Sequence, residues 1–222
     1  YVYPENKNEL SRLLAYCSKK QIPLFFAGSG SNLLVNDDGF NGVVISLQKY
    51  FKNITIKQNG IIKAEAGVML GNMVKNAIKS GIKGLESLAG VPGTVGGALI
   101  MNAGAFGSEI SNFFNEATVL TSNGEEKIYT SNHIKFGYRS STFPKNEILI
   151  DTSFKCETGE TIDIINNKNL ASQKRKDKQP LKFRSAGSIF KNPSIDFSAG
   201  YLIEKSGLKG MKSGSAEISK KH

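Results

Sequence analysis

The stretch that most constrains this chain is GLESLAGVPGTVGGALIMNAGAFG, residues 84–107, in which seven of 24 positions are glycine. Flexible Gly/Ser linkers contain few residues of the buried type, but leucine, isoleucine, valine and methionine lie among these glycines. Glycine permits close backbone approach and turns that other residues resist. The stretch therefore predicts a buried wall against which something flat or charged lies. A set of tight turns between packed elements is the alternative.

Composition excludes several classes of protein. The chain has 222 residues, 39% apolar and 22% charged, which is enough for one large or two modest domains and is not typical of disorder. No apolar run approaches the roughly 18 residues of a membrane span, and the first residues do not resemble a signal peptide. Cys17 and Cys156 each lie alone in the sequence, which favours core side chains in a reducing compartment. We expect a cytoplasmic, monomeric protein with no membrane partner and no metal site.

The formal net charge of +10 favours an anionic partner. The densest run, Lys174 to Lys178 (KRKDK), is short and has no aromatic residues within it, so we interpret it as a solvated helix end rather than a nucleic-acid patch. An anionic small molecule is the preferred partner. A basic, non-catalytic module that binds nucleic acid is the alternative from a different functional class.

Local signals predict an alternation of helices and strands. Asn6 followed by Glu9 predicts a helix cap, and Asn59-Gly60 and Asn123-Gly124 predict two hairpins. The other expected strands and helices are PLFFAG (23–28), VVISL (43–47), ILIDTSFK (148–155), and helices near 69–78, 161–176 and 199–207. The first 50 residues have α/β patterning, and strand pairs follow.

A second glycine loop, GSGSN, directly follows the predicted strand 23–28. It lacks the third glycine of a dinucleotide fingerprint and the Gly-Lys-Ser/Thr of a P-loop. Its successive backbone N–H groups, two serine hydroxyls and an asparagine amide could form a nest for a phosphate or pyrophosphate, and a plain turn is the alternative. The candidate residues are Gly28, Ser29, Gly30, Ser31 and Asn32.

Within residues 84–107, the Pro-Gly-Thr turn is rigid and the following small residues permit close approach, while an asparagine amide could hydrogen-bond ring heteroatoms. One loop for a pyrophosphate and one for a planar ring indicate a dinucleotide held without a Rossmann fold, and flavin adenine dinucleotide (FAD) is the natural candidate. The predicted contacts in this stretch are Gly90, Val91, Pro92, Gly93, Thr94, Gly96, Gly97, Ala98, Asn102 and Gly104.

Four motifs in this order resemble the UDP-N-acetylenolpyruvoylglucosamine reductase (MurB) family of bacterial cell-wall synthesis. They are AGSGSNLL (27–34), AGVPGTVGGALIMNAGAFG (89–107), the Tyr-Arg-x-Ser element at 138–141, and AGSIFKNP (186–193) with AGYLIEKSGLKG (199–210). The resemblance implies an α+β fold of the vanillyl-alcohol-oxidase (PCMH-like) type. It also implies domains at 1–50 and 51–177 that bind FAD and the start of a substrate domain at 178–222.

The family's chemistry implies specific roles for several residues. NADPH reduces FAD, and the reduced flavin reduces the enolpyruvyl group of a UDP-sugar to give UDP-N-acetylmuramate. The resemblance assigns Arg139 to the developing enolate and Ser188 to proton donation. Asn192 and Lys178 would bind the substrate's diphosphate, and Tyr138 would lie beside the substrate. Residue types alone leave a structural arginine, a turn serine, a surface lysine and a core tyrosine as alternatives.

The chain also departs from the family pattern. The family's catalytic glutamate comes from a C-terminal segment, and an N-terminal stretch completes its first flavin subdomain. We expect both to lie outside these 222 residues. Glu204 and Glu217 are expected at helix-surface and strand positions instead. A flavin oxidase of a sugar or alcohol is the alternative within the same fold class.

Overall fold

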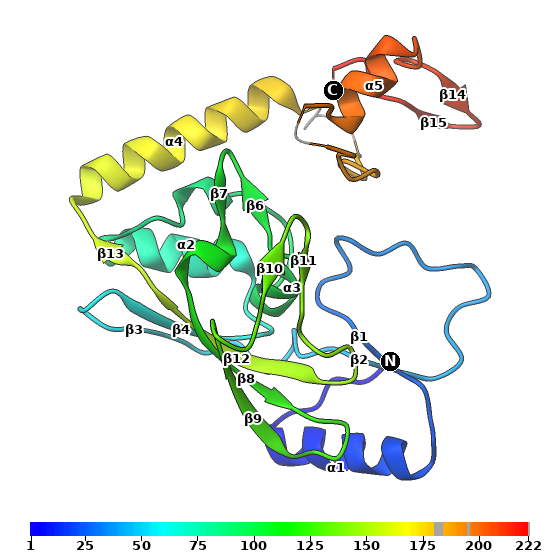
Figure 1. Ribbon diagram of the computed structural model, residues 1–222, viewed down its shortest axis with the longest axis vertical. Helices are drawn as coiled ribbons and strands as arrows, with labels where there is room; N and C mark the ends of the chain where they lie inside the picture. The colour runs from blue at the N-terminus through cyan, green and yellow to red at the C-terminus, as the bar shows by residue number, and fades with distance from the viewer. Residues whose placement is uncertain (180–183, 195, 222) are drawn as a thin grey trace. The chain divides into compact units, whose positions relative to one another are not determined.

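The computed structural model describes residues 1–179, 184–194 and 196–221, and its contacts divide the chain into two units, Tyr1–Asn169 and Leu170–His222. The helices shown in Figure 1 are α1 (Lys7–Lys19), α2 (Leu70–Lys79), η1 (Glu86–Leu88), α3 (Val95–Ile100), η2 (Ile110–Phe113), α4 (Thr161–Lys178) and α5 (Ala199–Lys205). The domain boundaries expected near 50 and 178 stay predictions.

The first unit is built on a five-stranded sheet with the order β3-β4-β12-β8-β9, in which every neighbouring pair is antiparallel. Its strands are β3 (Ile54–Ile56), β4 (Ile61–Glu65), β8 (Phe114–Leu120), β9 (Glu126–Thr130) and β12 (Ile148–Lys155). The short strands outside it are β1 (Leu24–Phe26), β2 (Val43–Ile45), β5 (Ile82–Lys83), β6 (Gly104–Ala105), β7 (Ser108–Glu109), β10 (Phe136–Gly137), β11 (Ser140–Ser141), β13 (Glu157–Thr158), β14 (Lys212–Ser213) and β15 (Ala216–Glu217).

One face of the central sheet forms the hydrophobic core. Because side chains alternate along a strand, Thr152 and Phe154 of β12 point to the same face, where they pair with Ala64 and Ile62 of β4. These four residues are fully buried. Helices α2 and α3 add Leu70, Met73, Val95 and Leu99 to the same core.

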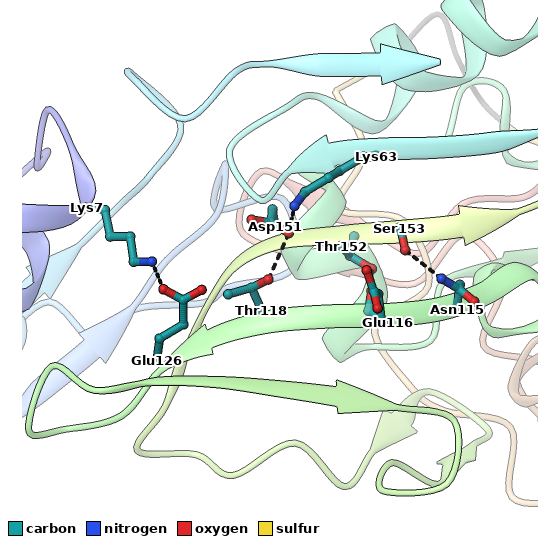
Figure 2. Close-up of polar contacts among 9 residues, drawn as sticks. All are labelled: Lys7, Lys63, Asn115, Glu116, Thr118, Glu126, Asp151, Thr152 and Ser153. Atoms are coloured by element: carbon teal, nitrogen blue, oxygen red, sulfur yellow. Dashed lines mark hydrogen bonds and ion pairs between the residues drawn. The ribbon is translucent and has the colours of Figure 1, made fainter. Parts of the chain in front are cut away.

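The opposite face of this sheet carries polar cross-strand contacts, drawn in Figure 2. The Asp151 carboxylate accepts a hydrogen bond from Thr118 Oγ1 at 3.0 Å and lies 3.1 Å from Lys63 Nζ. The pairing register of β8 and β12 skips Asn115, whose side-chain amide donates to Ser153 Oγ at 3.0 Å. These contacts link β4, β8 and β12 where the β8–β12 register shifts.

The N-terminal segment adds α1 and a parallel β1–β2 pair to this unit. Helix α1 lies beside the β8–β9 hairpin, since Lys7 pairs with Glu126 (Figure 2) and Ser11 Oγ donates to Gly124 O at 2.9 Å. Between β1 and β2 the chain runs out into a long loop, which Figure 1 shows extending away from the sheet. The Gly28–Asn32 segment opens that loop.

Most of the expected elements are confirmed. The two Asn-Gly hairpins form as β3–β4 and β8–β9, and β12 has the predicted bounds. Asn6 caps α1 by accepting from the Glu9 N–H at 3.0 Å, but the Glu9 carboxylate accepts from the Glu5 N–H rather than from Asn6. The return hydrogen bond of the predicted capping box therefore comes from Glu5, one residue before the cap residue Asn6. Helix α4 continues two residues beyond the predicted end at 176.

Both cysteines are free and buried, as predicted. Burial raises the pKa of the Cys156 thiol to about 12, and the charge of Glu86 adds to that shift. Within residues 1–179, 184–194 and 196–221, no helix is long and apolar enough to cross a membrane.

Candidate active site

The two predicted glycine loops lie against each other. A Cβ atom placed on Gly28 would be 2.6 Å from Thr94 Oγ1, and one placed on Gly93 would be 3.3 Å from Ser31 Oγ. The turn at residues 92–94 is itself anchored, because Leu70 N donates to Gly93 O at 2.9 Å and Val95 N donates to Val68 O at 2.7 Å. The structure thus brings together two loops that the sequence separates by about 60 residues.

Ser29 has a side chain that fits a phosphate-bearing ligand. Its hydroxyl is buried and, within the described part of the chain, has no hydrogen-bond partner. A buried polar group without a partner costs free energy, so its presence indicates a group that the fold is built to receive. Gly30, next to it, has a φ of 76°, and a Cβ there would meet nothing within 4 Å. Among the described residues, the loop is therefore open beside Gly30.

The 84–107 stretch is less uniform than the predicted wall, because it folds as η1, α3 and β6, joined by turns, and β6 then pairs with β7 just beyond the stretch. Its glycines include close-packed positions: a Cβ on Gly96 would be 2.8 Å from the Cβ of Ala66. Gly90 and Gly93 have positive φ values of 81° and 125°. The stretch contains tight turns, as the alternative interpretation has it, and it also contributes Val95, Ala98 and Leu99 to the core. That something flat or charged lies against it stays a prediction.

Asn102 lies at the end of α3 and is completely buried. Its side-chain Nδ2 donates to Glu109 Oε2 at 2.7 Å and to Gly137 O at 3.0 Å, and its Oδ1 accepts from Ser111 N at 3.4 Å. We expected this amide to hydrogen-bond a cofactor ring. In the structure Asn102 Nδ2 donates to two protein oxygens instead. The amide therefore hydrogen-bonds within the protein rather than to a cofactor ring.

Arg139 and Tyr138 form the two-residue turn between β10 and β11. The Arg139 guanidinium lies over the Tyr138 ring at 5.4 Å from its centroid, and Nη2 donates to Gly104 O at 3.0 Å. Tyr138 is 49% exposed, so the core-tyrosine alternative is wrong. The guanidinium is therefore held between an aromatic face and the glycine-rich stretch, at a surface where a ligand can reach the Tyr138 ring.

Strained backbone is concentrated around this turn. Among the described residues, four non-glycine residues have positive φ, and three of them are Asn102 (44°), Phe106 (53°) and Arg139 (53°). The first two lie at or next to the β6–β7 hairpin, whose Gly104 accepts from Arg139. Left-handed conformations of such residues cost free energy and are typical of functional sites. Three of these four residues therefore lie at the Arg139 turn or at the hairpin that it contacts.

The remaining predicted site residues belong to the second unit. Ser188 is exposed and follows Gly187, whose φ is 71°. Asn192 Oδ1 accepts from Ala199 N at 3.0 Å, next to the start of α5. Lys178 is the last residue of α4, and its side chain lies outside the described part of the structure.

The two acidic residues expected at structural positions of the second unit are found there. Glu204 is on α5 and pairs with Lys209 at 3.0 Å, while Glu217 is in β15 and lies 3.6 Å from Lys212.

Sequence reasoning missed Glu109. This residue caps η2 together with Asn112 and accepts the hydrogen bond from Asn102. A signal was present, because Glu109 is the one charged residue between Glu86 and Glu116. A carboxylate in an otherwise uncharged, glycine-rich stretch is expected to have a specific partner when it is partly buried.

Comparisons with known proteins support the two-part organisation. A family model described as an FAD binding domain matches residues 1–128, and the model of the UDP-N-acetylenolpyruvoylglucosamine reductase C-terminal domain matches residues 179–222.

Several bacterial proteins that are similar to this chain along nearly its whole length are named as the same reductase. UDP-N-acetylenolpyruvoylglucosamine reductase 2 of Bacillus cereus is 40% identical over 223 residues, which is 100% of this chain and 72% of that protein. The reductase of Clostridium kluyveri is 42% identical over 99% of the chain and 71% of its own length. The crystal structure of the enzyme from Thermus caldophilus has a TM-score of 0.83 at 35% identity, covering 98% of this chain and 77% of that one.

Proposed function

The chain belongs to the UDP-N-acetylenolpyruvoylglucosamine reductase (MurB) family, and from that premise we propose that it uses NADPH to reduce the enolpyruvyl group of its UDP-sugar in peptidoglycan precursor synthesis. It is an FAD-containing oxidoreductase with a PCMH-like, α+β FAD-binding fold. We further propose that it acts in the cytoplasm as a monomer, on small-molecule partners alone.

The glycine loops would hold the cofactor. FAD, when bound, supplies the hydride acceptor and donor of the reaction. Within the described part of the chain the Ser29 hydroxyl has no hydrogen-bond partner and the Gly30 backbone is open, and both observations support pyrophosphate binding at residues 28–32. The turn at 92–94, packed on that loop, supports a contact from the other side, with Gly90, Val91, Gly96, Gly97, Ala98 and Gly104 as the proposed neighbours.

Arg139 would stabilise the negative charge that develops on the substrate. Hydride addition to the terminal carbon of an enolpyruvyl ether moves charge into the carboxylate, and a guanidinium can form two hydrogen bonds with a carboxylate. The single observation that carries this proposal is the hydrogen bond from Arg139 Nη2 to Gly104 O, which holds the cation against the stretch that we propose to bind the flavin.

Ser188 would protonate the neighbouring carbon, and Asn192 and Lys178 would bind the diphosphate. The exposure of Ser188 supports access to substrate. A hydroxyl is a weak acid, so this role requires a relay or a neighbouring cation. Tyr138, half-exposed beside Arg139, would pack against the substrate.

Half-reaction kinetics test the proposal. The purified protein should be yellow, NADPH should bleach the flavin under anaerobic conditions, and the colour should return when the enolpyruvyl UDP-sugar is added. Full-speed recovery with oxygen alone would favour the flavin-oxidase alternative, and a colourless protein that binds nucleic acid would favour the basic module.

Variants of the second unit separate the two half-reactions. Ser188→Ala should slow flavin reoxidation by the substrate at least about 100-fold, as expected for loss of a positioned proton donor, and leave bleaching by NADPH nearly intact. The control is Ser194→Ala, which removes a hydroxyl that accepts from Phe197 N in the same unit. Equal losses in both half-reactions would refute proton donation by Ser188.

A further inference from the structure

Glu109 has no role in the reaction described above, yet two hydrogen bonds through Asn102 connect it to the strand that leads into the Arg139 turn. Its Oε2 accepts from Asn102 Nδ2 at 2.7 Å, and the same nitrogen donates to the carbonyl of Gly137 at 3.0 Å. Gly137 directly precedes the turn at residues 138–139. A charge-assisted hydrogen bond is short and directional, so the carboxylate determines how the Asn102 amide is oriented.

The turn is held to the same region on both of its strands. On the β10 side Gly137 accepts from Asn102, and on the β11 side Ser141 Oγ donates to Ile100 O at 2.7 Å. Ile100 is the last residue of α3, and Asn102 follows it after one residue. The Arg139 turn is thus fastened to the end of α3 by two side chains, of which only Asn102 is oriented by a carboxylate.

Both ends of this connection have strained backbone. Asn102 has a φ of 44° and Arg139 a φ of 53°. An isolated two-residue turn would relax from such a conformation unless the surrounding contacts over-determine it. Close packing adds to this constraint, because a Cβ on Gly104 would lie 2.8 Å from Glu109 Cγ and 3.4 Å from Arg139 Nη1.

We propose that Glu109 is a positioning residue for the reductase reaction, which orients the buried Asn102 amide and thereby holds the β10–β11 turn that presents Arg139. The proposal rests on the proposed function for its kinetic consequence. Glu109 itself does not touch the reacting groups in this scheme. Its position matters more than its charge, because what Asn102 requires is an acceptor at 2.7 Å.

Three variants of Glu109 separate position from charge. Glu109→Ala removes the acceptor, and Glu109→Asp keeps the charge but withdraws it by one methylene. Both should slow flavin reoxidation by the substrate about 10- to 100-fold, since a misplacement of about 1 Å can cost that much, while bleaching by NADPH changes less than about 3-fold. Glu109→Gln retains a carbonyl that can accept two hydrogen bonds and should stay within about 5-fold of the wild type.

Asn112→Ala is the matched control. It removes the hydrogen bond from Glu109 N to Asn112 Oδ1, 3.1 Å long, and so disturbs the cap of η2 without touching Asn102. Its reoxidation rate should match that of the wild type. In an Arg139→Ala background, Glu109→Ala should cause little further loss, because residues that act through one another are not additive.

A spectroscopic readout keeps this inference separate from the proposed function. The side-chain Nε resonance of Arg139, assigned by its loss in Arg139→Lys, should be a single sharp signal in the wild type and Glu109→Gln and broadened in Glu109→Ala. If the wild type fails to reoxidise with the UDP-sugar, the proposed function fails, and the resonance alone decides the positioning role. An unchanged resonance in Glu109→Ala, or wild-type reoxidation by Glu109→Asp, overturns the positioning role.

Discussion

Replacing Gly28 with alanine tests whether the two glycine loops are as closely packed as the structure has them. A Cβ at this position would lie 2.6 Å from Thr94 Oγ1, a distance that requires movement of one of the two groups. Thr94 is 2% exposed and cannot easily move away. Its hydroxyl also caps α3 by accepting from Gly97 N at 3.3 Å. We therefore expect Gly28→Ala to displace the Thr94 side chain and weaken the helix cap.

The magnitude follows from these two effects. Overpacking of one methyl group costs about 1–3 kcal/mol, and loss of a threonine cap costs about 1 kcal/mol. Their sum, about 2–4 kcal/mol, would lower the thermal midpoint of a chain of this size by roughly 5–15 °C. FAD affinity should fall as well, because the displaced groups belong to the proposed pyrophosphate site.

The assay is thermal unfolding of the flavin-free protein, followed by titration with FAD. A second substitution, at Thr94, tests the same contact from its other side. Thr94→Ala removes the two nearest atoms and leaves Thr94 Cβ at 3.7 Å, an ordinary contact distance. Gly28→Ala should therefore cost less than about 1 kcal/mol in the Thr94→Ala background.

The control is Gly71→Ala in α2, where an added Cβ would meet nothing within 4 Å. This change should be neutral or stabilise the protein by up to about 1 kcal/mol. Additive costs of Gly28→Ala and Thr94→Ala would refute the contact between the two loops.

Three further predictions concern other buried polar groups. Ser29→Ala should weaken FAD binding about 10-fold without lowering the stability of the flavin-free protein, because its hydroxyl has no hydrogen-bond partner to lose among the described residues. Titration with FAD and thermal melts measure the two effects. Asp151→Ala should cost about 1–3 kcal/mol in urea unfolding because Lys63 and Thr118 lose their acceptor, whereas removing the exposed Glu157 should cost clearly less, because solvent screens its pairing with Lys83. Because burial raises the folded-state pKa of Cys156 to about 12, the thiol's contribution to stability is complete at pH 8 and is lost as the pH rises toward that value. At pH 10 the wild type should have lost roughly 1–1.5 kcal/mol more of its unfolding free energy than Cys156→Ala.

Local sequence predicted the elements of this fold well, since their signals lie within the elements themselves. The Asn-Gly dipeptides and the alternating residues 148–155 each specify a hairpin or strand without reference to distant residues. The order of the strands could not be obtained in this way. That β12 lies between β4 and β8 depends on which apolar faces pack together, and many strand orders satisfy the same local pattern.

The residues of the candidate site could be predicted from residue type and resemblance, but the contacts among them could not. The sequence indicated Gly28–Asn32, residues 84–107 and Arg139, and the structure joins the first two through Thr94 and the last two through Gly104. The two acceptors of the Asn102 amide hydrogens, on Glu109 and Gly137, are 7 and 35 residues away along the chain. A pattern within one segment cannot show that a buried amide is already saturated by groups that only the tertiary fold brings near.

The central place of β12 has a consequence for the order of folding. The β3–β4 and β8–β9 hairpins can close locally as soon as they are synthesised, but they share no direct pairing and meet only through β12. Long-range closures of this kind are slow and leave strand edges open until they occur. Residues 84–107 lie between the two hairpins, so they emerge from the ribosome well before the strand that completes their scaffold. A nascent chain that stalls before Ile148 would expose this apolar, glycine-rich segment beside two unpaired edges, and that is the stage at which chaperone binding or aggregation should compete most strongly with folding.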